Sequence, residues 1–215
     1  MLSVVISFCK YLFVFLALAI AGYALSYYWH GDNPFNSRYH SLNSLGVYSH
    51  FIGAGFALLL GALQVFPSIG SRWHRRLGYG YCLAVVIAAA GGLYLSFHAH
   101  LGLVTGLGFA LADILWISFV GVAIYRVRQG DIGAHRRWML RSMALTSAGI
   151  SLRILLPLLC LALSFDTSYL MVAWLSWIGN LIAVEIYLHL SASGSSSMFL
   201  SPVSSMQLQS KELSQ

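Results

Sequence analysis

Histidine is the residue type in this chain whose positions point to chemistry. Eight histidines occur in 215 residues, and four of them lie near the ends of long apolar stretches. These four are His50, His74, His100 and His135. A neutral imidazole is a good axial ligand for haem iron. The pattern therefore raises the hypothesis of haem irons that each take two histidine ligands.

The elements that must position these histidines are apolar stretches of about twenty residues, a length that spans a hydrocarbon core of about 30 Å. About six such stretches are present, at 11–29, 47–66, 77–97, 103–125, 138–164 and 169–190. Hydrophobic residues make up 59% of the chain and charged residues 8%, too few charges to cover a soluble domain. The sequence predicts an all-α integral membrane protein of about six transmembrane helices, with a central four-helix bundle at about 47–164.

The domain organisation follows from the same pattern. We expect one transmembrane domain at 1–192 and a Ser-rich, disordered cytoplasmic tail at 193–215. The first stretch is longer than the apolar part of a usual signal peptide, so retention as a helix is favoured over cleavage. Three cysteines lie singly in apolar stretches and are interpreted as packing residues: Cys9, Cys82 and Cys160.

The basic residues predict the topology. Most of them lie in the loop after the second apolar stretch and in the loop after the fourth. The positive-inside rule makes both loops cytoplasmic, and with six spans the two termini are cytoplasmic as well. The formal net charge of +6 is therefore interpreted as a topology signal, and no nucleic-acid partner is expected.

Alternating helix direction sorts the four histidines into two pairs. The second and fourth stretches lie diagonally in a four-helix bundle, as do the third and fifth. His50 then pairs with His100 near the outer face, and His74 pairs with His135 near the inner face. His98 competes with His100 for the outer pair. Residues two apart point to different faces of a helix, so we expect only one of the two to face His50.

Two haem b groups bound by these pairs could pass electrons across the membrane, although the sequence names no donor or acceptor. Arginines next to the inner pair, such as Arg75 and Arg136, suit haem propionates. The alternative interpretation is that histidines at helix ends are interfacial and bond only to loop carbonyls or lipid headgroups.

Three charged residues lie well inside apolar stretches, where a charge costs about 2.5–3.5 kcal/mol. The predicted depths place Asp113 within reach of Arg153, and Glu185 at about the depth of Arg141. These residues form two structural salt bridges or serve function. In the functional interpretation, Arg153 neutralises a propionate of the outer haem, or Asp113 relays protons.

The stretch from His50 to about Pro157 resembles a bacterial family of predicted membrane proteins, domain-of-unknown-function family 2306. The resemblance rests on His50 with its downstream glycines, on a His-Arg-Arg-Leu-Gly string at 74–78, and on a His-Arg-Arg-Trp-Met-Leu-Arg-Ser string at 135–142 followed by Arg153. It covers about half of the chain. It implies a multi-pass protein of the bacterial inner membrane.

The helix arrangement more distantly resembles the b561-type cytochromes, whose central four helices hold two bis-histidine haems. That resemblance implies transmembrane electron transfer, with His50, His74, His100 and His135 at the four ligand positions. The alternative function is a non-catalytic membrane scaffold or a small-solute transporter that uses the buried charges.

Overall fold

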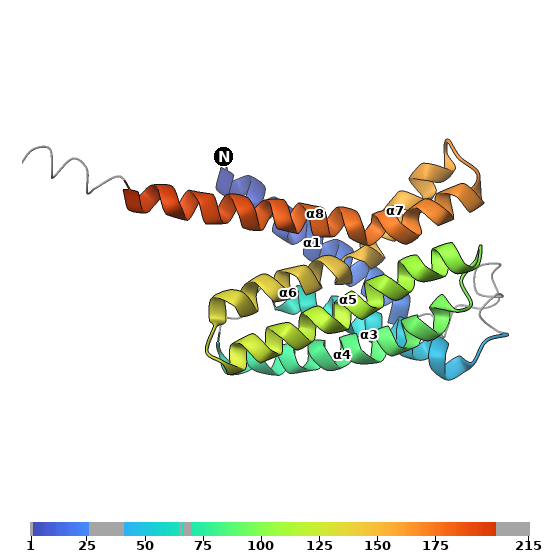
Figure 1. Ribbon diagram of the computed structural model, residues 1–215, viewed down its shortest axis with the longest axis horizontal. Helices are drawn as coiled ribbons and strands as arrows, with labels where there is room; N and C mark the ends of the chain where they lie inside the picture. The colour runs from blue at the N-terminus through green and yellow to red at the C-terminus, as the bar shows by residue number, and fades with distance from the viewer. Residues whose placement is uncertain (1, 26–40, 65, 67–69, 201–215) are drawn as a thin grey trace, which may run out of the picture.

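The computed structural model describes residues 2–25, 41–64, 66 and 70–200, with side chains for 11–24, 41–64, 66 and 70–192. All regular elements in these ranges are α-helices, which confirms the predicted all-α fold. The helices are α1 (Leu2–Leu25), α3 (Ser44–Leu63), α4 (Arg72–Ser96), α5 (Leu103–Arg128), α6 (Ile132–Thr146), α7 (Ala148–Cys160) and α8 (Phe165–Leu200). Figure 1 shows these helices running roughly along one long axis.

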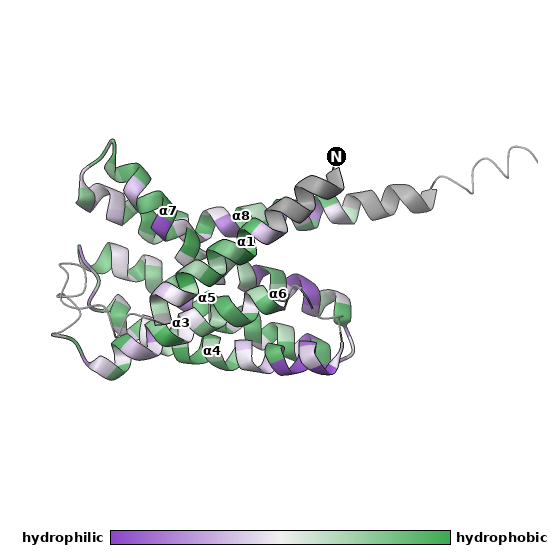
Figure 2. Cartoon of the chain, turned by 180° about the vertical axis from the view of Figure 1, so that it is seen from behind, coloured by the Kyte–Doolittle hydropathy of each residue, from purple (hydrophilic) through white to green (hydrophobic). Residues whose placement is uncertain are grey.

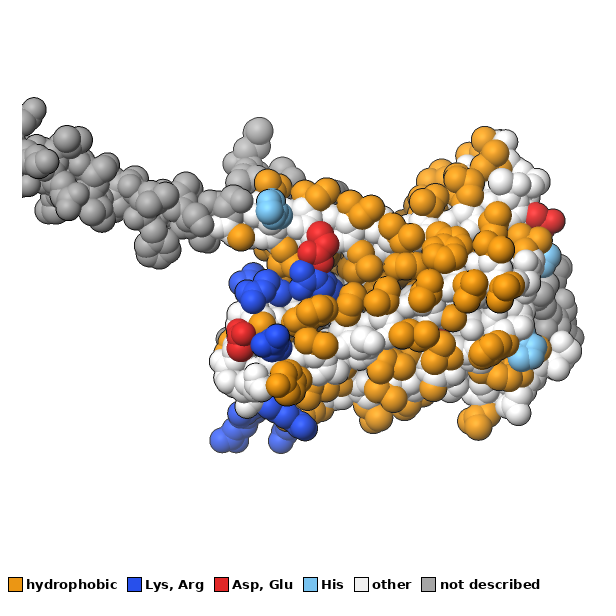
Figure 3. Space-filling view, in the orientation of Figure 1, with side chains coloured by type: hydrophobic (Ala, Val, Ile, Leu, Met, Phe, Trp, Pro, Cys, Tyr) orange, Lys and Arg blue, Asp and Glu red, His pale blue; other side chains and the backbone are white. Residues whose placement is uncertain are grey.

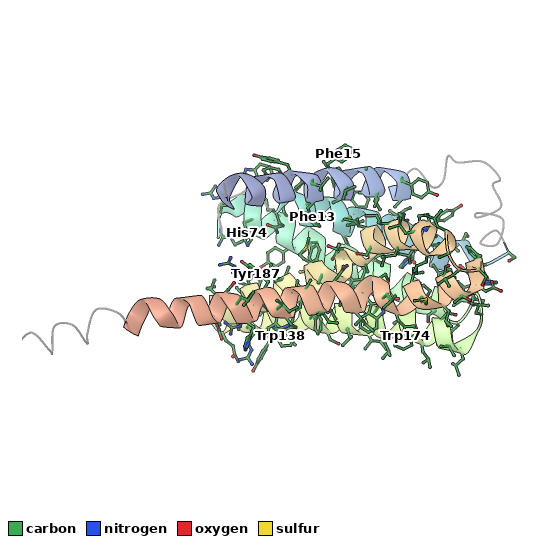
Figure 4. The ribbon with its side chains drawn as sticks, turned by 90° about the horizontal axis from the view of Figure 1, so that it is seen from above. Phe13, Phe15, His74, Trp138, Trp174 and Tyr187 are labelled. Atoms are coloured by element: carbon green, nitrogen blue, oxygen red, sulfur yellow. The ribbon has the colours of Figure 1, made fainter. Side chains whose placement is uncertain are left out.

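Length and composition confirm a multi-pass membrane protein. In the described residues, five segments are long and apolar enough to cross a membrane, with α6 and α7 counted together. The described side chains of α1 add a shorter apolar helix at Tyr11–Ala24. Residues of hydrophobic character occupy most of the length of the helices (Figure 2). On α1, Phe15 points away from the bundle, whereas Phe13 packs against the core (Figure 4).

Helices α3, α4, α5 and α6 form the central bundle. Each packs against the next, and α6 closes the ring by contacting α3. The pair α3 and α5 and the pair α4 and α6 are therefore the diagonals, as the sequence predicted. Helix α1 packs on α3, while α8 packs on α5, α6 and α7.

Small residues allow α3 and α4 to approach closely. Helix α4 contributes a run of alanine and glycine residues at 88–92, and four of these five residues are buried. A Cβ atom on Gly53 of α3 would lie 2.7 Å from the backbone nitrogen of Ala88, closer than Cβ atoms approach such neighbours in real proteins. The two backbones therefore touch where a larger residue would separate them.

The predicted span at 138–164 corresponds to one candidate membrane span, Ile132–Cys160, but it consists of two helices, α6 and α7, that are separated at Ser147 (Figure 1). The cause is local hydrogen bonding. The Thr146 hydroxyl donates to the Ser142 carbonyl at 3.0 Å, and the Ser147 hydroxyl donates to the Met143 carbonyl at 2.8 Å. Such bonds to the preceding turn bend helices. Pro157 lies inside α7 and does not end it.

Two other predicted boundaries differ. The basic run at 72–76 is not a loop but the start of α4, because Ser71 caps the helix by accepting from the His74 backbone N–H at 3.1 Å. Helix α8 continues to Leu200, past the end of the predicted transmembrane domain. Most of the predicted loop at 30–46 and the end of the tail, 201–215, lie outside the described residues.

Arginines gather at one end of the bundle, which we call the basic end (Figure 3). This end contains the start of α4, the end of α5 and the start of α6. Helix α1 begins, and α8 ends, toward the same end (Figure 1). The basic residues are therefore clustered at one end of the bundle, as the topology prediction required. The cytoplasmic location of this end stays a prediction.

Candidate functional site

A cavity of about 520 Å³ lies in the half of the molecule away from the basic end. Its walls come from the central bundle and from α1, α7 and α8, and they are mostly apolar. The charged and imidazole side chains that line it are His50, His98, His100, Asp113 and Arg153. The structure thus brings the predicted outer histidines to one cavity, together with Asp113 and Arg153, which were predicted to lie within reach of each other.

His50 projects from α3 with a defined tautomer. Its Nδ1 lies 3.0 Å from the carbonyl oxygen of Ala88 on α4. A carbonyl only accepts hydrogen bonds, so Nδ1 carries the proton and Nε2 keeps its lone pair. A backbone carbonyl on the other ring nitrogen is a common support for a metal-binding histidine. Nε2 of His50 can therefore accept a hydrogen bond or bind a metal.

His98 and His100 both line the cavity, contrary to the prediction that they point to different helix faces. The reason is that α4 ends at Ser96, so both residues lie in a turn. The Nδ1 atom of His98 donates to the Tyr94 carbonyl at 3.0 Å, which leaves a lone pair on Nε2. His100 instead donates through Nε2 to the Asp166 carboxylate at 2.7 Å.

The predicted ion pair between Asp113 and Arg153 is not formed. Arg153 donates from Nη1 to the Gly149 carbonyl at 3.0 Å, and its guanidinium lies 5.5 Å from the ring centroid of Tyr23 on α1. The helix break explains the difference, because α7 diverges from the bundle toward α1. Arg153 still lies near enough to His50 for an electrostatic interaction.

Asp113 of α5 is a buried acid in the cavity wall. Its side chain is only 7% exposed, and among the described residues no cation or hydrogen-bond donor pairs with its carboxylate. Gly92 of α4 provides the space for this carboxylate, because a Cβ atom there would collide with it. Asp113 is thus placed by packing and not by an ion pair.

A buried network of hydrogen-bonded side chains lies between Asp113 and the basic end. The sequence analysis did not predict it. The Tyr81 hydroxyl lies 2.6 Å from the Ser142 hydroxyl and 2.7 Å from that of Thr146. Trp116 donates from Nε1 to Thr146 at 3.1 Å. Ser142 and Thr146 are four residues apart in an apolar helix, the spacing that could have indicated a polar stripe facing the core.

The two histidines of the predicted inner pair both lie at the basic end. His74 and His135 lie in the first turns of α4 and α6, near enough for an electrostatic interaction. His135 donates through Nδ1 to the Ala123 carbonyl at 2.9 Å, which repeats the arrangement of His50. The buried Nδ1 of His74 has no partner in the described part of the chain. Figure 4 shows His74 at the basic end, and neither histidine lines the 520 Å³ cavity.

The second predicted ion pair is confirmed. Arg141 of α6 donates from Nε and Nη2 to the two carboxylate oxygens of Glu185 on α8, at 2.5 and 2.8 Å. The Arg141 guanidinium also lies 4.7 Å from the ring centroid of Trp138. This arrangement ties α8 to the bundle, so a structural role accounts for both charges.

Among the described side chains, no group of three or more histidine, cysteine, aspartate or glutamate residues could hold a metal ion. A bis-histidine haem needs only two imidazoles, because the porphyrin supplies the other ligands.

The comparison with protein families extends over most of this structure. A family model described as a predicted membrane protein (DUF2306) matches residues 47–188, well over half of the chain. The chain belongs to the DUF2306 family. The match runs from α3 into α8 and includes all the candidate residues discussed above, from His50 to Glu185.

The other comparisons add no further relative to this DUF2306 protein. No curated protein matches the chain, and no solved structure matches it. The resemblance to the b561-type cytochromes stays a prediction.

Proposed function

We propose that this DUF2306 protein binds haem b in the 520 Å³ cavity and works in electron transfer within the membrane. One observation carries the proposal: His50 and the histidines of the 97–102 turn come from different parts of the bundle and line the same largely apolar cavity. A bound haem would supply one-electron chemistry. The protein would supply the ligands, the apolar surroundings and the charge.

The residues present fit such a group. His50 offers an Nε2 lone pair, and the Ala88 carbonyl holds its ring in place. Trp116 and Trp177 provide aromatic walls for a flat macrocycle. Arg153 has a guanidinium at the cavity, and guanidinium groups pair well with carboxylates such as haem propionates.

The hydrogen bonds favour His98 over His100 as the second ligand. Nε2 of His98 keeps a lone pair, because its Nδ1 already donates to a backbone carbonyl. Nε2 of His100 is engaged with Asp166 of α8. We therefore assign His98 as the partner of His50, and we assign to His100 the role of joining the turn to α8.

The inner pair, His74 and His135, is the proposed second haem site. Its support is the proximity of the two imidazoles and the lone pair that His135 keeps on Nε2. Arg75 and Arg136 are exposed next to these histidines in the sequence and carry the charge that propionates need.

A transporter of small solutes is the competing function. It is favoured by the cavity itself, which places the unpartnered Asp113 carboxylate next to a largely apolar space. Visible absorption of the purified protein distinguishes the two functions, because only a haem protein absorbs visible light.

Variants of the two turn histidines test the ligand assignment. We expect His98→Ala to lose the haem of the cavity and His100→Ala to retain it, because only His98 presents an Nε2 lone pair. The measurement is haem content and the reduced-minus-oxidised spectrum of each purified variant. Full haem content in His98→Ala would contradict the assignment, and loss confined to His100→Ala would transfer the role to His100.

A further inference from the structure

Asp113 is the buried acid that the ligand assignment leaves unexplained. Asp113 lies near the middle of α5, its side chain is more than nine-tenths buried, and it lines the cavity. An ionised carboxylate in such a place costs several kcal/mol unless a positive charge offsets it. Among the described residues no side chain pairs with it, so any compensating charge must come from the occupied cavity or from a proton.

The surroundings of Asp113 contain several other titratable or charged groups. They come from nearly every element packed around the cavity, and they are Tyr23 of α1, His50 of α3, His98 and His100 of the turn, Arg153 of α7, and Tyr169 of α8. Helix α4 contributes Gly92, Leu95 and Ser96 to the wall, none of which titrates. Arg153 and His100 already have protein partners, namely the Gly149 carbonyl and Asp166.

We infer that Asp113 is the proton acceptor of the cavity, and that it binds one proton when the cavity site receives one electron. The inference rests on the proposed function. Before reduction, the positive charge of the occupied cavity would offset the Asp113 carboxylate. An electron from a one-electron donor cancels that positive charge. The carboxylate then takes a proton from water, so one electron and one proton enter together and the charge of the cavity is unchanged.

The polar side chains next to Asp113 in the cavity wall are consistent with this role. Trp116, one helical turn further along α5, lines the cavity together with Thr146. Both belong to the hydrogen-bonded network of Tyr81 and Ser142. Hydroxyl groups both donate and accept, so this network can orient water beside the acid without adding a charge.

The test is the pH dependence of the haem reduction potential in the wild-type protein and in Asp113→Asn. We expect the wild-type reduction equilibrium to change about tenfold per pH unit, which is about 59 mV for one electron. Asn has nearly the same shape but cannot bind the proton, so the pH dependence should vanish. Asp131→Asn is the matched control, because Asp131 caps α6 at the basic end and Asn is an equally good cap.

Infrared difference spectra between the reduced and oxidised proteins provide a second readout. The wild-type protein and Asp131→Asn should gain the C=O band of a protonated carboxylic acid on reduction, and Asp113→Asn should not. Coloured protein with the same pH dependence in the wild type and Asp113→Asn would overturn the inference and leave the proposed function standing. Colourless wild-type protein would overturn both.

Discussion

Replacing His50 with alanine should remove the haem of the cavity while the helices stay folded. The loss of affinity should exceed the roughly 10–100-fold effect of removing a supporting partner, because the substitution removes a direct ligand of the iron. If both proposed sites are filled, haem content per chain should fall by about half. The measurement is haem extracted from purified protein, set against protein concentration.

The matched control for this variant is His189→Ala. His189 lies on the exposed surface of α8 and does not line the cavity, so its loss should leave the haem content unchanged. Helical content by circular dichroism should be the same in both variants. Equal haem content in His50→Ala and wild type would remove His50 from the site and contradict the proposed ligation.

Replacing Gly91 with alanine should have the largest effect on stability among single-methyl changes at the site. The added Cβ atom would lie 2.5 Å from the His50 backbone nitrogen and 2.6 Å from the Gly46 carbonyl oxygen. Both are backbone atoms, so α3 and α4 must move apart. We expect a destabilisation of about 1–3 kcal/mol, the range for overpacking, measured by unfolding in detergent.

Gly121→Ala is the control for this change. A Cβ atom at Gly121 of α5 would meet nothing within 4 Å, and alanine favours a helix over glycine by about 0.5–1 kcal/mol. It should therefore be neutral or stabilising. Gly91→Ala as stable as Gly121→Ala would show that α3 and α4 do not touch at Gly91.

The helices were predictable because their cause is local. Twenty apolar residues in a row must form a transmembrane helix, since the bilayer offers no partner for an open backbone. Alternating direction then placed His50, His74 and His135 correctly along the bundle. The ion pair of Arg141 and Glu185 followed from depth alone, because few polar partners exist at a given level of an apolar bundle.

What the sequence could not predict depends on short-range detail. Ser147 breaks a helix through a side-chain bond to the preceding turn, whereas Pro157 does not. Because of this break α7 leaves the bundle, and the Arg153 guanidinium lies against the ring of Tyr23 instead of pairing with Asp113. The end of α4 at Ser96 brought His98 and His100 to the same cavity. Each result depends on where a helix ends, which periodicity locates only to within a few residues.

The reduced-minus-oxidised absorption spectrum of the purified wild-type protein, produced with an ample haem supply, tests the proposed function most directly. A haem site with two imidazole ligands predicts the spectrum of a low-spin b-type cytochrome, with haem that organic solvent extracts because it is not covalently bound. Well-folded protein without visible absorption would contradict the proposed haem binding and favour the alternative that the cavity binds a small solute.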